Sequence, residues 1–302
     1  MRRRCEKSDM QFEILTLFPD MVETVLSTSI IGRARAAGLI GVSCRQIRDY
    51  TKDKHRRTED TLYGGGTGLL MTPQPICDCV EAALREAPEG ERRRVIYMSP
   101  KGALLTQNKC AELAASYDRL ILLCGHYEGV DQRALDECVD EEISIGDYVL
   151  TGGEIPACIL VDAVSRLIDG VLACEESYTD ESIASGLLEC PHYTHPAVYR
   201  GREVPAVLLT GHHANIDKWR LEQSLALTKE RRPDLYDAWM LAHPPAPPKK
   251  KRKKVSHAKA ETAADTPEKS ADPVHVASGN DTGGTEMTTD ALQSDDTSNR
   301  SF

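Results

Sequence analysis

Along residues 10–172 the pattern of hydrophobic and polar residues alternates between strand-like and helix-like segments, which predicts strands separated by helices. Short uninterrupted apolar runs are typical of strands buried on both faces, whereas apolar residues spaced three and four apart are typical of helices. The strands are expected at 10–19, 39–47, 93–100 and 119–125, and the helices at 20–38, 73–87, 106–116 and 154–169. This alternation predicts an α/β fold in which helices cover both faces of a parallel sheet.

The remaining segments differ in composition. Residues 1–9 form a charged extension, residues 173–185 are polar and indicate a flexible linker, and residues 186–243 have a mostly helical pattern, notably at 216–232. Residues 244–302 contain one Phe as their only aromatic residue, so they cannot bury enough apolar area to offset chain entropy. We therefore predict an α/β domain, a linker, a small helical domain and a disordered tail.

Composition indicates the compartment of the protein and whether its cysteines bind metal. No apolar run approaches the ~18–20 residues that span a bilayer, and the charged N-terminus lacks a secretory signal, so we expect a cytoplasmic protein without membrane contact. The ten cysteines show no paired spacing that would hold zinc, which favours reduced thiols and no metal ligands.

The net charge of −10 works against binding to nucleic acid as a whole. Residues 244–302 carry nine basic and nine acidic side chains, so the entire excess of negative charge lies in residues 1–243. An RNA partner would therefore need local basic patches on this part of the chain.

Candidate chemistry lies in three loops that follow predicted strands, MSPKG (98–102), CGHYEGVD (124–131) and SIGDYVLTGGE (144–154). Ligands of open parallel sheets bind where such loops converge, and glycine lets the backbone approach a flat heterocycle. In any single loop the glycine is better explained by a tight turn, and it is the three glycine-bearing loops together that favour a pocket. The loops match no dinucleotide fingerprint, and YGGGTGLLM (63–71) lacks the ending of a phosphate-binding P-loop.

Seven motifs occur in the order and spacing of one known family: FPDM, YGGGTGLLM, SPKG, CGHYEGVD, SIGDYVLTGGE, GLLECPHYTHP and WRLEQSL. Over about residues 10–240 the chain resembles the bacterial tRNA (guanine-N1)-methyltransferases of the knotted (SPOUT) superfamily. The resemblance implies a deep trefoil knot in the sheet and methylation of guanine 37, beside the anticodon of tRNA, with S-adenosylmethionine as methyl donor.

The resemblance also implies which residues form the sites. Those expected to hold S-adenosylmethionine are Tyr97, Ser99, Pro100, Gly102, Cys124, Gly125, Tyr127, Glu128, Gly129, Ile145, Gly146, Asp147, Tyr148, Val149, Leu150, Gly152 and Gly153. Those expected to recognise the guanine are His55, Asp60, Tyr63, Gly64, Gly65 and Gly66.

Methyl transfer to guanine N1 requires a base for the N1 proton and a cation near O6. The resemblance assigns the cation to Arg166, for which a helix-surface ion pair is the alternative. The family usually has Asp where this chain has Glu181, so the base is Glu181 acting in place or its neighbour Asp180.

The resemblance further implies a homodimer with the active site at its interface, and it leaves magnesium open as an additional cofactor, although the sequence shows no ligand cluster for it. A basic and aromatic set in the second domain would contact tRNA: Lys218, Trp219, Arg220, Lys229, Arg231 and Arg232. Two other functions stay open, namely methylation of a ribose 2′-hydroxyl and non-catalytic RNA binding.

Overall fold

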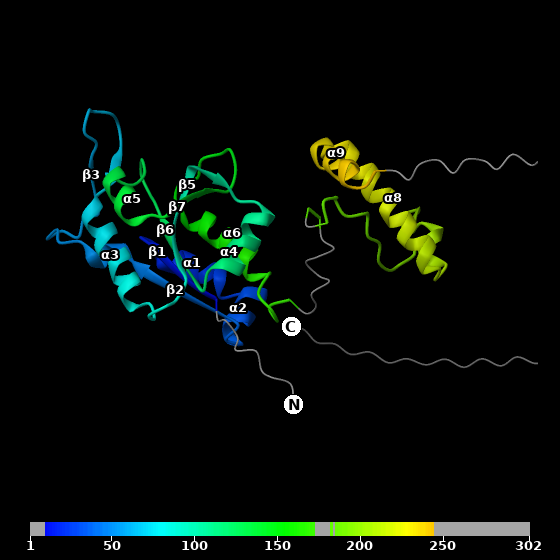
Figure 1. Ribbon diagram of the computed structural model, residues 1–302, viewed down its shortest axis with the longest axis horizontal. Coiled ribbons are helices and arrows are strands. Elements are labelled where there is room, and N and C mark those ends of the chain that lie inside the picture. The colour runs from blue at the N-terminus through cyan, green and yellow to red at the C-terminus, as the bar shows by residue number, and fades with distance from the viewer. Residues whose placement is uncertain (1–9, 173–181, 184, 245–302) are drawn as a thin grey trace, which may run out of the picture. The chain divides into compact units, whose positions relative to one another are not determined.

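A five-stranded parallel sheet forms the centre of the first part of the chain (Figure 1). The computed structural model describes residues 10–172, 182–183 and 185–244. The strands of the sheet are β1 (Met10–Thr16), β2 (Ile40–Gln46), β5 (Arg93–Leu104), β6 (Arg119–Cys124) and β7 (Glu141–Ser144). They lie in the order β2-β1-β6-β5-β7, and every pair is parallel.

Helices pack on both faces of this sheet, and each face has its own hydrophobic core. One core contains residues of α1 (Pro19–Leu26), α2 (Ser29–Ala36), α4 (Gln107–Ser116) and α6 (Glu154–Ser165). The other contains residues of the 3-10 helix η1 (Ile47–Tyr50), α3 (Pro73–Glu86) and α5 (Gln132–Cys138).

Strand β6 shows why this arrangement follows from its sequence. Its side chains alternate between the two cores, with Leu120 and Leu122 in the first and Ile121 and Leu123 in the second, and all four are fully buried. Because successive side chains of a strand point to opposite faces, a continuous apolar run requires cover on both sides. The predicted α/β fold with a covered parallel sheet is confirmed.

A short antiparallel hairpin stands beside the sheet and was not predicted. It consists of β3 (Glu59–Thr61) and β4 (Leu69–Met71), joined by the glycine-rich loop. Backbone hydrogen bonds attach β4 to the loop that follows β6: Glu128 N–H donates to Leu69 O over 2.9 Å, and Met71 N–H donates to Gly129 O over 3.0 Å. The hairpin is therefore fixed to one of the three candidate loops.

Two predicted elements differ in the structure. The single helix expected at 20–38 is divided into α1 and α2, because Thr28 has an extended backbone (φ −112°, ψ 168°) that interrupts the helical hydrogen bonds. The strand expected at 93–100 continues to Leu104 in β5, and its pairing with β7 shifts register between Met98 and Ala103, around the SPKG loop.

Residues 185–244 make up the second part of the described chain. They contain the hairpin β8 (Val198–Tyr199) and β9 (Arg202–Glu203), the 3-10 helix η2 (Ala206–Leu209), α8 (His213–Arg231) and α9 (Pro233–Ala242). The prediction of a mostly helical segment is confirmed by α8 and α9, whereas most of 186–212 is not helical. This segment is held to α8 by buried Thr228, whose hydroxyl accepts a hydrogen bond from Leu188 N over 2.9 Å.

The extension 1–9, most of the linker 173–185 and all but the first residue of the tail 244–302 lie outside the described residues, so the proposed domain boundaries stay predictions. The trefoil knot likewise stays a prediction from the resemblance. Among the helices described, none has both the length and the apolar character needed to cross a membrane.

Candidate functional site

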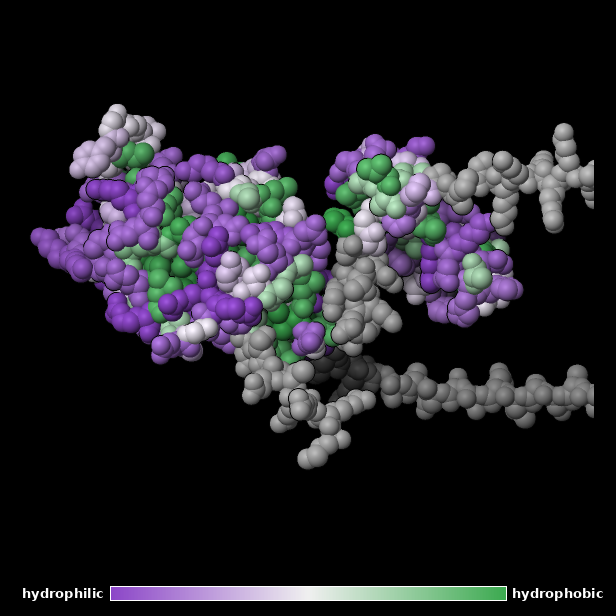
Figure 2. All heavy atoms as spheres, viewed as in Figure 1, coloured by the Kyte–Doolittle hydropathy of each residue, from purple (hydrophilic) through white to green (hydrophobic). Residues whose placement is uncertain are grey.

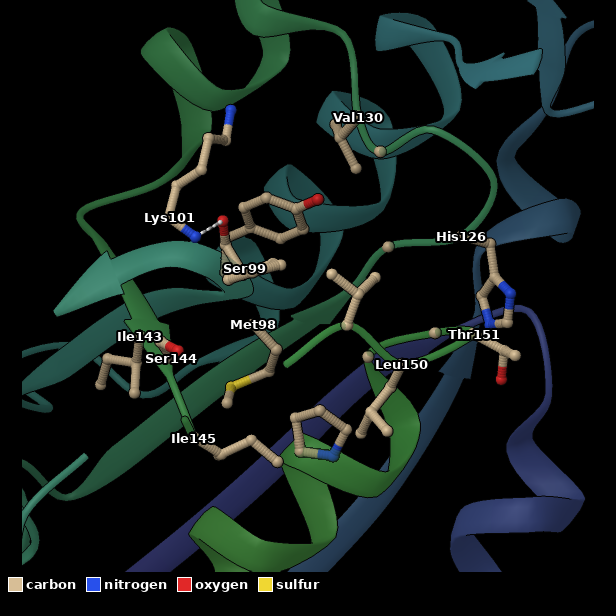
Figure 3. A pocket seen from close by; sticks show the side chains of 18 of the residues that line it. Met98, Ser99, Lys101, His126, Val130, Ile143, Ser144, Ile145, Leu150 and Thr151 are labelled. Carbon is tan, nitrogen blue, oxygen red and sulfur yellow. Dashed lines mark hydrogen bonds between the residues drawn. The ribbon is translucent and has the colours of Figure 1, made fainter. Parts of the chain in front are cut away.

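The three candidate loops meet around one cavity of about 340 Å³, at the carboxyl ends of β6 and β7 and at the SPKG segment within β5. Most residues predicted to hold the donor line it: Tyr97, Ser99, Pro100, Gly125, Tyr127, Glu128, Gly129, Ile145, Gly146, Tyr148, Val149, Leu150, Gly152 and Gly153. Met98 from the first loop and Ile145 and Leu150 from the third come together to make an apolar wall (Figure 3). The volume lies within the range of about 300–1,000 Å³ found for small-molecule sites.

Three predicted donor residues do not line this cavity. Gly102 packs against the β7 backbone at Glu142, and Asp147 is exposed. Cys124 is fully buried at the end of β6, where burial raises the pKa of its thiol well above the usual value. Gly102 and Cys124 thus support the loops from behind the cavity wall, and Asp147 lies on the surface outside the lining.

Nine further residues line the cavity and were not singled out from the sequence: Met98, Lys101, His126, Val130, Leu135, Ile143, Ser144, Thr151 and Pro156. Six of them lie inside the three quoted loop motifs, so membership in a motif was the available signal. The signal was absent for Ile143, which lies within β7, and for Leu135 and Pro156, which lie on helices beyond the loops.

Glycines permit the loops to approach one another closely at two positions on the cavity wall. A Cβ atom at Gly153 would lie 2.7 Å from the Cα of Cys124, and one at Gly125 would lie 2.7 Å from the hydroxyl oxygen of Tyr97. The Gly153 N–H also donates to Gly125 O over 3.0 Å. A side chain at Gly153 would push the third loop away from the second, and one at Gly125 would displace Tyr97, so both glycines have a steric reason beyond turn formation.

The phenol of Tyr97 forms a buried part of the cavity wall, with 6% of the residue exposed. Burial, and secondarily the charge of Glu142, raises the pKa of Tyr97 to about 12. The ring is therefore neutral at physiological pH.

The residues predicted to recognise guanine lie on or just before the β3–β4 hairpin. Tyr63 is 99% exposed at its tip. Gly64, Gly65 and Gly66 follow with positive φ values of 84°, 83° and 125°, and nothing lies within 4 Å of where their Cβ atoms would be. His55 and Asp60 make local hydrogen bonds, through the His55 N–H to Asp53 and through the Asp60 carboxylate to the Thr61 N–H.

Glu128 connects this hairpin to the cavity. Its side chain lines the cavity, and one of its carboxylate oxygens lies 2.5 Å from where a Cβ of Gly68 would be. A ligand in the cavity and a base held by the hairpin would therefore be neighbours, on either side of this carboxylate.

The predicted catalytic groups are only partly described. Arg166 caps the C-terminus of α6 and is half-buried, with its N–H donating to Asp162 O over 3.2 Å. Asp180 and Glu181 lie outside the described residues. Within the ranges that are described, no group of three or more His, Cys, Asp or Glu residues is placed to hold a metal ion.

The predicted tRNA-contacting set lies on or next to α8 and α9, with acidic residues among it. Arg232 forms a two-bond pair with Asp234 (2.9 and 2.6 Å), and weaker pairs join Lys218 to Glu222 and Arg220 to Asp217. Among the residues that the structure describes, the other three members form no ion pair of this kind. The Nζ of Lys229 lies 5.5 Å from the ring centre of Tyr236, the rings of Trp219 and Tyr193 have centres 6.4 Å apart, and Arg231 is exposed.

Comparison with known proteins gives consistent matches over the same part of the chain. A family model described as "tRNA (Guanine-1)-methyltransferase TrmD" matches residues 10–238. A protein of Ruminiclostridium cellulolyticum named "tRNA (guanine-N(1)-)-methyltransferase" is 56% identical over 228 residues, which cover 76% of this chain and 97% of the relative. Relatives with the same name from Lachnospira eligens and from a Cyanothece species are 53% and 47% identical, each over 78% of this chain and, respectively, 98% and 97% of their own length.

Proposed function

This chain belongs to the tRNA (guanine-1)-methyltransferase family, and we propose that it transfers the methyl group of S-adenosylmethionine to N1 of guanine 37 in tRNA. One observation carries the proposal: the glycine-rich cavity and the β3–β4 hairpin meet at Glu128, so a donor and a base have adjacent places. This reaction would place the chain in the cytoplasm with its tRNA substrate.

The cavity has the features that the donor requires. When bound, S-adenosylmethionine supplies an electrophilic methyl group on a positively charged sulfur. The close approach of the loops at Gly125 and Gly153 shapes one wall of the cavity, while Ile145 and Leu150 offer apolar surface that suits a flat adenine. The carboxylate of Glu128 provides negative charge on the side of the cavity that faces the hairpin, which favours a cation there.

The hairpin would present the guanine. The exposed ring of Tyr63 can stack on a base, and the open glycines after it allow the base to contact the backbone. The N1 proton must leave as the methyl group arrives, and we assign its removal to Glu181, with Asp180 as the alternative. Arg166 would stabilise the negative charge that develops on O6. The described residues offer magnesium no ligand cluster, and no step is assigned to a metal.

A second copy of the chain is part of this proposal, and an apolar surface supports it. Phe18, Met21 and Val25 repeat along one face at the start of and within α1, and Ile155 and Ile159 lie one turn apart on α6; each is at least 41% exposed. Helices α1 and α6 contact each other, so these side chains belong to neighbouring elements. Apolar residues also reach the surface of this part of the chain as green areas among hydrophilic ones (Figure 2).

The decisive experiment measures methyl transfer from labelled S-adenosylmethionine to two tRNA transcripts that differ only in having G or A at position 37. We expect label in the first transcript alone, recovered as N1-methylguanosine after digestion to nucleosides. Recovery of a ribose-methylated nucleoside would instead establish the alternative methyltransferase. Donor binding without transfer to either transcript would favour the non-catalytic alternative.

The dimer is tested by sedimentation of the full chain and of Ile159→Asp. The unaltered chain should sediment as a dimer, and the variant as a folded monomer, because a carboxylate buried in an apolar interface is strongly unfavourable. A matched control is Leu221→Asp, which alters a residue of similar exposure (45%) on α8. A monomeric unaltered chain would refute this part of the proposal.

A further inference from the structure

His126 connects three separate segments at the edge of the cavity. Its ring nitrogen Nε2 lies 2.7 Å from the Oε2 of Glu154, the first residue of α6, and its backbone N–H lies 3.2 Å from the sulfur of Met71 on β4. Its ring also packs against Phe18, with 4.8 Å between the ring centres. His126 and Gly152 form an isolated antiparallel bridge, so the second and third loops run side by side here. Figure 3 shows His126 next to Thr151 at one side of the cavity.

The hydrogen bonds around Glu154 determine how this contact is oriented. Glu154 is 2% exposed, and its Oε1 accepts a 2.6 Å hydrogen bond from the hydroxyl of Thr16, which itself accepts from Phe18 N over 2.8 Å. The other oxygen, Oε2, shares a hydrogen bond with Nε2 of His126. Both carboxylate oxygens are thus engaged, one by β1 and the other by the second loop.

We propose that His126 and Glu154 form a positioning pair that sets the second and third loops at the spacing required to bind the methyl donor. The inference rests on the proposed function, because it concerns the affinity of that same cavity. Neither side chain needs to touch the reacting atoms. The pair acts by fixing Gly152 and Gly153 against Gly125, the contacts that shape the cavity wall.

A second buried carboxylate provides a matched control. Glu13 on β1 is also 2% exposed, and it accepts hydrogen bonds from Arg45 (2.5 Å) and Arg119 (3.2 Å). None of these three residues lines the cavity. Glu13→Gln should lower the stability of the sheet without changing the spacing of the loops.

The test measures the Kd for S-adenosylhomocysteine, the demethylated donor, by calorimetry on the full chain, together with the thermal midpoint of each variant. We expect His126→Phe and Glu154→Gln each to raise the Kd about tenfold, the factor corresponding to ~1.4 kcal/mol, at the low end for a lost hydrogen bond to a charged group. The double variant should raise it little more than either single one, because both remove the same contact. Glu13→Gln should lower the thermal midpoint and leave the Kd unchanged.

A second pair of variants separates the hydrogen bond from packing. In His126→Gln the side-chain nitrogen is as many bonds from Cα as Nε2 is, whereas in His126→Asn it is one bond closer and cannot reach Glu154. We expect the Gln variant to bind S-adenosylhomocysteine several-fold more tightly than the Asn variant. This comparison remains informative if the Phe variant fails to fold.

Three results would overturn the inference: equal affinity of the Gln and Asn variants, additive effects in the double variant, or an equally weakened Glu13→Gln. If the unaltered chain itself binds no S-adenosylhomocysteine, the proposed function fails, and not this inference alone. Tight binding by the unaltered chain and by every His126 variant refutes the positioning pair and leaves the proposed function intact.

Discussion

Replacing Gly153 by Ala tests the close approach of the loops at the cavity. The new Cβ would lie 2.7 Å from the Cα of Cys124, whereas carbon atoms at optimal separation are about 3.5–4.0 Å apart. The two atoms must therefore separate by roughly 0.8 Å or more. Cys124 cannot move easily, because it is fully buried at the end of β6, between β1 and β5.

The displacement must consequently be taken up by the third loop, which lines the cavity. Forcing an extra methyl group into a packed site destabilises proteins by about 1–3 kcal/mol, and a misplacement near 1 Å lowers catalysis by about a hundredfold. We expect Gly153→Ala to lower the free energy of unfolding by about 1–3 kcal/mol. We also expect it to lower kcat/KM for S-adenosylmethionine by about a hundredfold.

The assays are urea unfolding and methyl transfer at limiting donor concentration. The matched control is Gly41→Ala on β2, where the three atoms nearest the new Cβ all belong to the side chain of Gln11. This variant should keep its kcat/KM, because neither Gly41 nor Gln11 lines the cavity. The reasoning is refuted if Gly153→Ala and Gly41→Ala have the same activity and stability.

Three other predictions follow from the same structure. Because the pKa of Tyr97 is raised to about 12, its buried phenol contributes stability that is complete below the unfolded pKa of ~10 and is lost as pH rises through about 12. Tyr97→Phe should therefore show a shallower loss of stability over this range in urea titrations at increasing pH. Glu181→Ala should slow single-turnover methylation by about 10²–10⁴-fold while Asp180→Ala changes it little, and an unchanged rate in both variants would show that the base lies outside this segment. Deleting residues 245–302 should leave the thermal midpoint and tRNA methylation unchanged, because α9 ends at Ala242 and the match to the family model ends at residue 238. A loss of activity would show that the deleted segment contributes to methylation.

Much of the fold could be predicted because its strands carry local signals. The run of Leu120 to Leu123 is short and apolar throughout, which is typical of a strand covered on both faces. The β3–β4 hairpin was missed because three-residue strands such as Glu59–Thr61 are too short to show any periodicity. The break at Thr28 was missed since the apolar spacing continues across it, and only the backbone conformation reveals the interruption.

The cavity was predicted in part for a related reason. Three glycine-bearing loops at strand ends could be expected to converge, because the carboxyl ends of parallel strands share one edge. The pairing of His126 with Glu154 could not, since it joins residues 28 positions apart through a contact that depends on how two loops cross. Similarly, nothing local in the sequence indicates that β4 joins the loop at Glu128 and Gly129.

The hydrogen bonds from β4 to the second loop have a consequence for how ligands of this protein should be sought. A compound that changes the geometry of the cavity also acts on the hairpin, since Leu69 and Met71 are bonded to the cavity loop itself. Thermodynamic reciprocity then requires that any factor by which the compound alters affinity for the RNA equals the factor by which the RNA alters affinity for the compound. Affinities measured on the isolated protein and on its RNA complex should accordingly differ for a compound that acts through these hydrogen bonds, and the ratio of the two affinities measures the coupling.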